Sequence, residues 1–459
     1  MKTILTTFFL IVILNGIQAQ VTFVSNGQQF NNMKSRCVKI GDLNNDGNPD
    51  AFVVNEDNCR VYFGSESGQF TESTQRIPLT PWVWGADIGD INNDGKIDAI
   101  IDRTVWLNDG EGNFAAKPGQ IGDSVSITIG LIVKLADLNG DGHLDIFSIR
   151  DFANIRVFIN DGTGSFKFNG QNLGDGTIGT GQIAHIALGD INNDGFVDAV
   201  TGGWKWDGST QCPNRIWLND GKGNFQDSGQ FLDEGVSHVH GLALGDLNSD
   251  GWIDLAMGIQ DNSRSGRIYY NDGKGILIKG QILGGQSGEN LAFGDFDGNG
   301  KLDIFSAISS QANRVWLNNG DSTFINNNQR PGTSTAMNWD VAISDVNSDK
   351  KPDAIIASVR EGIQIWLNNS TVSLIEKKND TGVLFYPNPT TGQFTLSFGT
   401  TTLIQATAEI YNTDGRLVLS KTFRNTATAT IDLTGYPKGI YMVKTIADGM
   451  VYYEKFIIE

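Results

Sequence analysis

The chain has 459 residues and a formal net charge of −18 at pH 7, from 34 Lys and Arg against 52 Asp and Glu. This acidity argues against binding to nucleic acids or to anionic membranes, because both attract basic surfaces. Three cysteines are few for a chain of this length, so a disulfide-rich scaffold is excluded as well.

The first residues have the pattern of an export signal. Lys2 precedes an apolar run from Ile4 to Leu14, and small residues follow up to a cleavage site after Ala19. This predicts a signal peptide over residues 1–19. The apolar run is too short for a stable membrane anchor, and no other stretch approaches its length, so we expect no transmembrane segment.

An acidic nonapeptide of the form Asp-x-Asn-x-Asp-Gly-x-x-Asp recurs seven times between residues 42 and 353. A hard divalent cation such as calcium requires oxygen ligands, which positions 1, 3, 5 and 9 supply, while position 7 adds its backbone carbonyl and glycine at position 6 permits the turn. We therefore expect up to seven structural calcium ions. The predicted ligands are Asp42, Asn44, Asp46, Asn48, Asp50, Asp90, Asn92, Asp94, Lys96, Asp98, Asp137, Asn139, Asp141, His143, Asp145, Asp190, Asn192, Asp194, Phe196, Asp198, Asp246, Asn248, Asp250, Trp252, Asp254, Asp295, Asp297, Asn299, Lys301, Asp303, Asp345, Asn347, Asp349 and Asp353.

The flanks of the nonapeptide distinguish it from an EF-hand. An EF-hand loop ends in a bidentate Glu at position 12, whereas position 12 here is apolar or small. Short β-type runs precede and follow each copy, so each loop is expected to join two antiparallel strands. The alternative is an Asx-rich turn that needs no metal. The last copy should bind most weakly, because Lys350 replaces its glycine.

The spacing of the copies predicts a β-propeller. Successive first-position Asp residues are 48, 47, 53, 56, 49 and 50 residues apart, and a period near fifty with several short strands is typical of a propeller blade. A second motif with one aromatic residue recurs in every repeat, and we expect those aromatics to pack between blades. They are Tyr62, Trp106, Phe158, Trp217, Tyr269, Trp316 and Trp366.

The two ends of the repeat region complete each other. The seventh repeat lacks its outer strand, while Phe23 precedes Asp42 by 19 residues, as the outer-strand Phe does in complete repeats. Residues 21–27 should therefore supply the outer strand of blade seven and close the ring. The fold class is thus predicted as all-β: a seven-bladed β-propeller with calcium loops over residues 20–371, followed by a small C-terminal β-sandwich.

These repeats resemble the FG-GAP/VCBS-type propellers, including those of integrin α-subunits and of some fungal lectins. The resemblance covers roughly residues 21 to 370. It implies that the calcium loops lie on one face and are structural, and that ligands bind the other face.

Beyond a linker at residues 372–384, the composition changes. The phrases YPNPTTGQFTLSF from Tyr386, AEIYNTDGRLVLSKTF from Ala408 and IDLTGYPKGIYMVKTIADGMVYYEKFIIE from Ile431 resemble the type A C-terminal sorting domain of the type IX secretion system of Bacteroidetes. Residues 385–459 are assigned to this domain. The resemblance implies passage through the periplasm and across the outer membrane, with the secretion machinery as a partner, and then release or attachment at the cell surface. The alternative is an ordinary immunoglobulin-like domain.

Two cysteines are candidates for a disulfide. Cys37 begins the inner strand of blade one, and Cys59 is expected on the connection between the second and third strands of that blade. Both would then lie at one end of the blade, where an oxidising compartment permits a bond. Cys212 would remain unpaired.

Several polar and aromatic residues depart from the regular repeat on the segments that face away from the calcium loops. Trp beside Asp, Asn, Glu and His suits carbohydrate, because aromatic faces stack on sugar C–H surfaces while polar groups orient hydroxyls. The purely structural alternative is that these Trp residues fill the central channel or pack under loops. The predicted ligand-binding residues are Trp82, Trp84, His185, Trp204, Trp206, Asp207, His240, Glu289, Trp339 and Asp340.

The functional hypothesis is a secreted or cell-surface, monomeric, calcium-stabilised protein that binds carbohydrate in the manner of a lectin. A protein-binding adhesin is the alternative, followed by a polysaccharide-cleaving enzyme in which Glu289, Asp340, His185 and His240 supply acid and base groups. No nucleophile elbow, phosphate loop or metallohydrolase motif is present, so no catalytic residue is assigned. A metal site at His238 and His240 lacks an obvious third ligand.

Overall fold

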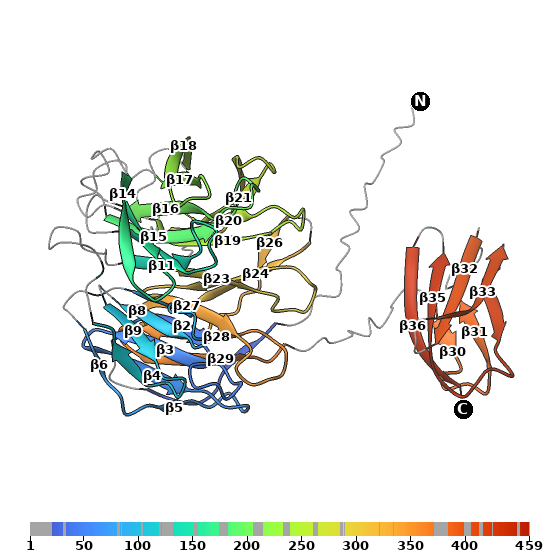
Figure 1. Cartoon of the computed structure of the whole chain (residues 1–459). Helices are drawn as coiled ribbons and strands as arrows, with labels where there is room; N and C mark the ends of the chain where they lie inside the picture. The colour runs from blue at the N-terminus through green and yellow to red at the C-terminus, as the bar shows by residue number, and fades with distance from the viewer. Residues whose placement is uncertain are drawn as a thin grey trace. The chain divides into compact units, whose positions relative to one another are not determined.

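The computed structural model describes residues 21–458 except 31–33, 80–82, 84, 102–103, 119–120, 122–131, 150–154, 174–181, 205–213, 233–238, 260–264, 285–287, 289, 321, 334, 371–383, 399–404, 413–415, 425 and 448–449. Every regular element in this part of the chain is a β-strand (Figure 1). The chain divides into two compact units, Met1–Ser373 and Leu374–Glu459. The predicted signal peptide lies outside the described residues, and so does nearly all of the predicted linker.

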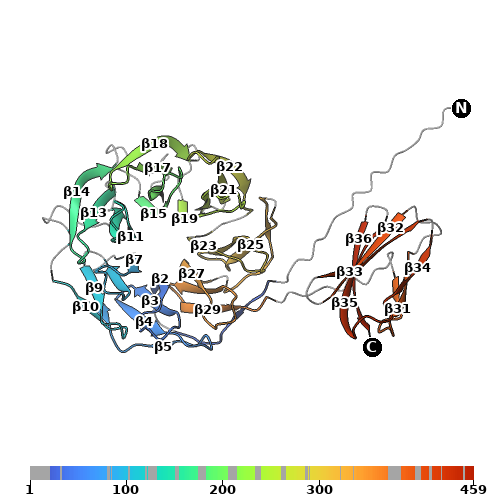
Figure 2. The ribbon, with the colours of Figure 1, turned by 45° about the vertical axis from the view of Figure 1, so that its right-hand side comes forward.

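The first unit is a β-propeller. Its described residues form seven antiparallel sheets, one for each predicted repeat, arranged in a ring with the first strand of each sheet innermost (Figure 2). We number these blades by the order of their acidic nonapeptide loops. Blade one contains β2 (Ser35–Gly41), β3 (Asp50–Asn55), β4 (Asn58–Phe63), β5 (Thr71–Glu72) and β6 (Ile77–Pro78). Blade two contains β7 (Ala86–Gly89), β8 (Asp98–Ile101), β9 (Thr104–Asn108) and β10 (Phe114–Ala116).

The remaining blades repeat this order from the inside outward. Blade three contains β11 (Ile132–Ala136), β12 (Asp145–Ile149), β13 (Ile155–Asn160) and β14 (Phe166–Leu173), and blade four contains β15 (Gln182–Gly189), β16 (Asp198–Trp204), β17 (Asn214–Asn219) and β18 (Phe225–Leu232). Blade five contains β19 (Val239–Gly245), β20 (Asp254–Ile259), β21 (Arg267–Asn271) and β22 (Leu277–Ile282), and blade six contains β23 (Asn290–Gly294), β24 (Asp303–Ala307), β25 (Arg314–Asn318) and β26 (Phe324–Asn326). Blade seven contains β27 (Asn338–Ser344), β28 (Asp353–Ser358), β29 (Gly362–Asn368) and the N-terminal β1 (Phe23–Ser25).

The N-terminal strand closes the ring as predicted. β1 pairs antiparallel with β29, with Phe23 opposite Asn368. Gln28, just beyond β1, then reaches blade one: its side-chain nitrogen donates to the carbonyl of Phe70 at 2.9 Å, and its side-chain oxygen accepts the N–H of Phe70 at 2.8 Å. The first described segment therefore joins blades seven and one.

The second strand of each blade is the centre of the packing. After their first Asp these strands are mostly apolar, and all six residues of β3 are buried, as expected for strands covered on both faces. The predicted aromatics each belong to a hydrophobic cluster drawn from two adjacent blades. Tyr62, Phe158, Trp217, Tyr269 and Trp316 are buried, while Trp106 and Trp366 are partly buried in the same kind of cluster.

The predicted disulfide is wrong. Cys59 lies within β4 rather than on a connection, and the register places Cys37 opposite Val54, and Val54 opposite Cys59. The two cysteines are therefore two strand spacings apart, about 10 Å, whereas a disulfide requires Cα atoms within about 7 Å. Both are buried free thiols. Cys212 lies outside the described residues.

We expect Cys37 and Cys59 to be inert in the folded protein. Burial raises the pKa of Cys37 to about 12 and holds that of Cys59 well above its ordinary value, so neither forms the reactive thiolate at neutral pH. Iodoacetamide should label neither thiol in native protein and both in denaturant without reductant, as read by peptide mass spectrometry. Labelling that requires prior reduction would show that a disulfide forms after all.

The second unit is a small β-sandwich, as predicted. One sheet contains β30 (Leu384–Tyr386), β31 (Gln393–Ser397) and β34 (Thr428–Asp432). The other contains β32 (Gln405–Asn412), β33 (Leu417–Arg424), β35 (Gly439–Ala447) and β36 (Met450–Ile458). Their inner faces share one core, to which Phe394 and Ile431 contribute from the first sheet and Ile410, Val443 and Phe456 from the second.

Candidate metal centres and the opposite face

Each acidic nonapeptide joins the first and second strands of a blade. In blade one, Gly41 ends β2 and pairs with Asp50, which begins β3, so the loop from Asp42 to Pro49 closes the hairpin. The corresponding residues pair in the other six blades. All seven loops therefore lie at the same end of their inner strands.

Within a loop, side-chain oxygens turn the backbone. In blade four the carboxylate of Asp190 accepts the N–H groups of Asp194 at 3.0 Å and Gly195 at 2.8 Å. The amide oxygen of Asn192 accepts the Asp194 N–H at 3.1 Å, and the Asp194 carboxylate accepts the Phe196 N–H at 2.9 Å. Positions 1, 3 and 5 thus converge on one small space, as a cation site requires.

The ninth-position Asp is buried and held in place by backbone hydrogen bonds in each loop. Asp254 is fully buried, and its two carboxylate oxygens accept the N–H of Leu247 at 2.9 Å and that of Asn271 at 2.8 Å. Each oxygen keeps a second lone pair for a metal. The same pair of bonds recurs at Asp50, Asp98, Asp145, Asp198, Asp303 and Asp353.

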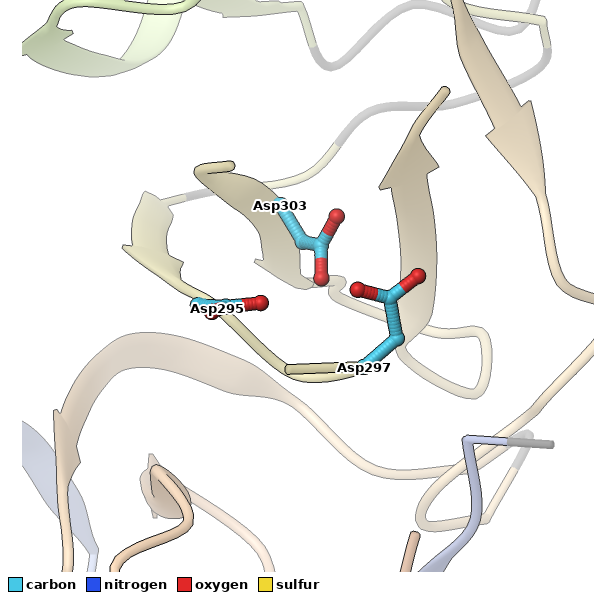
Figure 3. Close-up of side chains that lie close together, drawn as sticks. All are labelled: Asp295, Asp297 and Asp303. Carbon is cyan, nitrogen blue, oxygen red and sulfur yellow. The ribbon is translucent and has the colours of Figure 1, made fainter. Parts of the chain in front are cut away.

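The sixth loop concentrates the most negative charge. Asp295, Asp297 and Asp303 point their carboxylates at one another (Figure 3), with one oxygen from each within 4.8 Å of the others. Among the described residues this is the one group of three acidic, His or Cys side chains that meets so closely. Burial raises the pKa of Asp303 to about 7, and the charges of Asp297 and Asp295 act in the same direction. A divalent cation would offset this repulsion, so the donor set fits calcium.

In the other six loops burial raises the pKa of the ninth-position Asp to about 6, although backbone N–H groups that donate to its carboxylate oppose the shift. The seventh loop differs in its backbone. Lys350 occupies the glycine position with a φ of 65°, a conformation that costs a residue with a side chain about 1 kcal/mol. This strain agrees with the expectation that the seventh copy is the weakest.

A buried asparagine in the hairpin turn hydrogen-bonds to the acidic loops of two neighbouring blades. The sequence predicted only its place in the turn. In blade five the side chain of Asn271 donates to the carbonyl of Ile253 in its own loop at 3.0 Å and to that of Ile191 in the loop of blade four at 2.7 Å. Its oxygen accepts the N–H groups of Gly273 and Gly275. Equivalent links start from Asn108, Asn160, Asn219, Asn318 and Asn368. The signal for this role was the recurrence of this Asn before the turn glycine.

The predicted ligand-binding residues divide into two groups. Trp82, Trp84, Trp206, Asp207 and Glu289 lie outside the described residues, as does His238, and the side chain of Trp204 is also outside them. His185, His240, Trp339 and Asp340 are described, and all four lie on inner strands.

Four inner strands carry a β-bulge at the end away from the acidic loops. The ladder shifts register around Arg36, Ala184, His240 and Trp339, each six residues before the first Asp of its loop. A bulge directs a side chain away from the regular pleat and is common beside binding sites. Here the Arg36 guanidinium lies 5.9 Å from the ring centroid of Trp339, although the two belong to different blades.

Seven polar side chains, one from each inner strand, form what we call the axial cluster. They are Lys39, Asp87, Lys134, His185, His240, Asn290 and Asp340. They lie on the strands at the centre of the ring (Figure 2). Neighbouring inner strands pack against one another around the whole ring. Three pairs of members from adjacent blades are in contact or close to it: Asn290 with Asp340, Lys39 with Asp87, and His185 with His240.

Asp340 is held by the protein itself. Its carboxylate accepts the backbone N–H of Val38 in blade one and of Val341, each at 3.0 Å, and the side-chain nitrogen of Asn290 in blade six. The residue thereby connects three blades. The rings of His185 and His240 lie 6.2 Å apart between centroids, and burial lowers the pKa of His185 well below its ordinary value.

The ring of seven small antiparallel sheets defines a β-propeller, and comparison with known proteins identifies its repeats. The model of the FG-GAP-like repeat matches residues 42–101, 137–201, 206–257, 246–306 and 295–356. The model of the secretion system C-terminal sorting domain matches residues 384–459. The chain belongs to the FG-GAP-like repeat family and ends in a type IX secretion system sorting domain.

The sorting domain indicates use of the type IX secretion machinery and export across the outer membrane, to the cell surface or the medium. The propeller is therefore part of a secreted or cell-surface protein. In the described part of the chain, no helix has the length and apolar character needed to cross a membrane.

One curated relative is the T-cell immunomodulatory protein homolog of Plasmodium yoelii yoelii, which is 29% identical over 145 residues, or 26% of this chain and 19% of that protein. The chain thus spans about a fifth of that relative. Among solved structures, BBS1N in complex with ARL6DN has a TM-score of 0.49 at 11% identity, covering 78% of this chain and all of that one. The extracellular domain of BT4673 of B. thetaiotaomicron, a candidate one-component system, has a TM-score of 0.47 at 9% identity, covering 96% of this chain and 57% of that one.

Proposed function

We propose that this protein is a calcium-stabilised binding protein that takes carbohydrate on the propeller face opposite the acidic loops. The calcium part rests on the convergence of side-chain oxygens in every loop, most clearly where three carboxylates meet within 4.8 Å in the sixth. Because each loop joins two strands of one blade and is linked to the next blade by a buried Asn, bound calcium would act on the scaffold and not on a substrate.

The proposal that this face binds carbohydrate rests on the β-bulges of the inner strands. They present Arg36, His240 and Trp339 out of the ladder, at the end of the blades that the acidic loops leave open. All three side chains are partly exposed. An indole ring offers a flat apolar surface to the C–H groups of a sugar, while guanidinium and imidazole N–H groups donate to its hydroxyls. The predicted Trp84 and Trp206 would extend this surface.

Substitution of Trp339 by Ala should weaken glycan binding at least about fivefold, since stacking on an aromatic ring contributes on the order of 1 kcal/mol beyond buried area. The measurement is a glycan array with the calcium-loaded full-length protein, followed by titration of the best glycan against Trp339→Ala and Trp84→Ala. Phe231→Ala is the matched control, because Phe231 is an exposed aromatic on the outer strand β18.

The remaining functions are the other outcomes of that experiment. An empty array together with specific capture of one surface protein would replace the lectin proposal by adhesion. Release of reducing ends from a polysaccharide would replace it by an enzyme, with His185 and His240 as the first candidates for acid and base groups. Glycan binding that is equal in Trp339→Ala and wild type would move the site away from the bulges.

A further inference from the structure

One sheet face of the sorting domain exposes a group of apolar side chains. The sheet formed by β33, β32, β35 and β36 turns one face into the core that it shares with the smaller sheet. On its other face the strand registers place Leu417 opposite Tyr411, and Tyr411 opposite Met442. Ile440 lies two residues before Met442 on the same face, opposite Ile457. Because opposite residues have Cβ atoms about 5 Å apart, these five side chains form one surface, which we call the apolar patch.

The apolar patch is open to solvent. The exposed fractions are 47% for Leu417, 44% for Ile440, 38% for Met442 and 37% for Ile457, and Tyr411 is partly exposed. Single apolar side chains on a surface are ordinary, but a contiguous group of large ones marks an interaction site. Because strand pairing sets the positions of all five residues, the patch is already formed before any partner arrives.

The other end of the same sheet face pairs its polar groups within the domain. The carboxylate of Glu409 accepts from the ammonium of Lys444 at 3.1 Å and from the hydroxyl of Tyr411 at 2.9 Å. The hydroxyls of Thr407 and Thr422 are hydrogen-bonded to each other at 3.2 Å. This end gains little from a partner, whereas covering the apolar patch would remove apolar surface from water. A partner for this face would therefore dock at the apolar end.

The size of the apolar patch argues against a second copy of this chain as the occupant. Even an aromatic side chain buries only about 200 Å², and these five are each less than half exposed, so the patch offers under about 500 Å². A stable dimer buries about 800 Å² on each subunit. The patch therefore fits a partner that also contacts the surface around it, with the patch as the apolar centre of the interface.

We propose that the apolar patch is the surface through which the sorting domain docks on an apolar protein surface of the type IX secretion machinery. All five residues lie within residues 384–459, the segment that matches the sorting domain, and this domain indicates use of that machinery. The two sequence phrases from Ala408 and from Ile431, on which the resemblance to sorting domains rests, supply all five residues. The machinery must contact the outside of the sandwich, because the inner faces of both sheets are closed by their shared core.

Ile440→Lys should lower the fraction of full-length protein outside the outer membrane at least about tenfold, because docking would bury an ammonium against an apolar surface. The protein should accumulate in the periplasm instead. Immunoblots of the periplasmic, cell-surface and medium fractions of a Bacteroidetes host with an active type IX system measure this. Ile278→Lys is the matched control: it makes the same change at an isoleucine that is 56% exposed on the outer strand β22 of the propeller, and should be exported as wild type is.

Export of Ile440→Lys at the wild-type level overturns the proposal, and so does an equal loss of export in Ile278→Lys. Export of the wild type that persists in a strain without the type IX translocon overturns it as well. Should Ile440→Lys fail to fold by circular dichroism, Leu417→Lys takes its place with the same criteria.

A photo-crosslinking amino acid in place of Ile440 identifies the occupant in the same host. Crosslinks to a component of the type IX machinery support the proposal. Crosslinks only to a second copy of this chain or to lipid, or none at all, overturn it. The export and crosslinking results do not depend on glycan binding, so the proposed carbohydrate function is tested separately by the glycan array.

Discussion

Excess chelator should lower the melting temperature of the full-length protein by more than about 10 °C. A cation bound only by the folded state stabilises it by RT ln(1 + [L]/Kd), which is about 1.4 kcal/mol per site when calcium is tenfold above the dissociation constant. Extracellular calcium sites reach dissociation constants of about 0.1 mM, so about 1 mM calcium satisfies this condition. The sum over the seven predicted loops is then about 10 kcal/mol, and a domain of this size shifts by somewhat more than 1 °C per kcal/mol.

Differential scanning calorimetry in calcium and in EGTA measures the shift, with magnesium as the control. Magnesium prefers smaller octahedral sites and keeps its waters, so it should restore much less of the stability. A melting curve that is the same in calcium and in EGTA would mean that the loops are metal-free Asx turns, which their internal hydrogen bonds also permit.

Asp254→Ala should be among the most destabilising substitutions in the propeller, with or without calcium. The substitution leaves the N–H groups of Leu247 and Asn271 buried without an acceptor, and each unsatisfied buried group costs about 1–3 kcal/mol. Asp250→Ala is the matched comparison. Asp250 is exposed and lies at position 5 of the same loop, so its loss in EGTA should stay within about 1 kcal/mol.

The two variants separate scaffold from metal in a single loop. In calcium, Asp250→Ala should lose one site's share of the stabilisation, whereas Asp254→Ala should lose that share and the two hydrogen bonds. Urea unfolding in both buffers gives the four free energies of unfolding. If Asp254→Ala unfolds at the same urea concentration as Asp250→Ala in EGTA, the backbone hydrogen bonds of the ninth-position Asp do not stabilise the loop.

Periodicity carried most of the fold. The acidic loops and the apolar runs after them predicted the strand pairs that each loop joins. The pattern is informative because a shift of one residue in a strand would turn its buried side chains to the other face. The position of Phe23 relative to Asp42 predicted the pairing of β1 with β29. One aromatic per repeat predicted the clusters between blades, since a repeated core needs a repeated large side chain.

Features that depend on contacts between residues far apart in the chain could not be predicted from the sequence. The link from Asn271 to the loop of blade four joins residues 80 positions apart. The bulges at Arg36, His240 and Trp339 are invisible in the repeat pattern, because the extra residue lies where the strand begins. Cys59 was misplaced for a related reason: β4 begins one residue before it, which moves the thiol from a connection into a ladder.

The central claim is that the acidic loops are structural calcium sites that stabilise the propeller. Ligands would then bind the opposite face. Calcium content after dialysis against about 1 mM calcium, measured by inductively coupled plasma mass spectrometry, tests it most directly. We expect a ratio that approaches seven ions per wild-type chain and falls by one in Asp250→Ala, with the same ligand binding in both. A ratio near zero in wild type, or ligand binding that disappears in Asp250→Ala while the fold is retained, would contradict it.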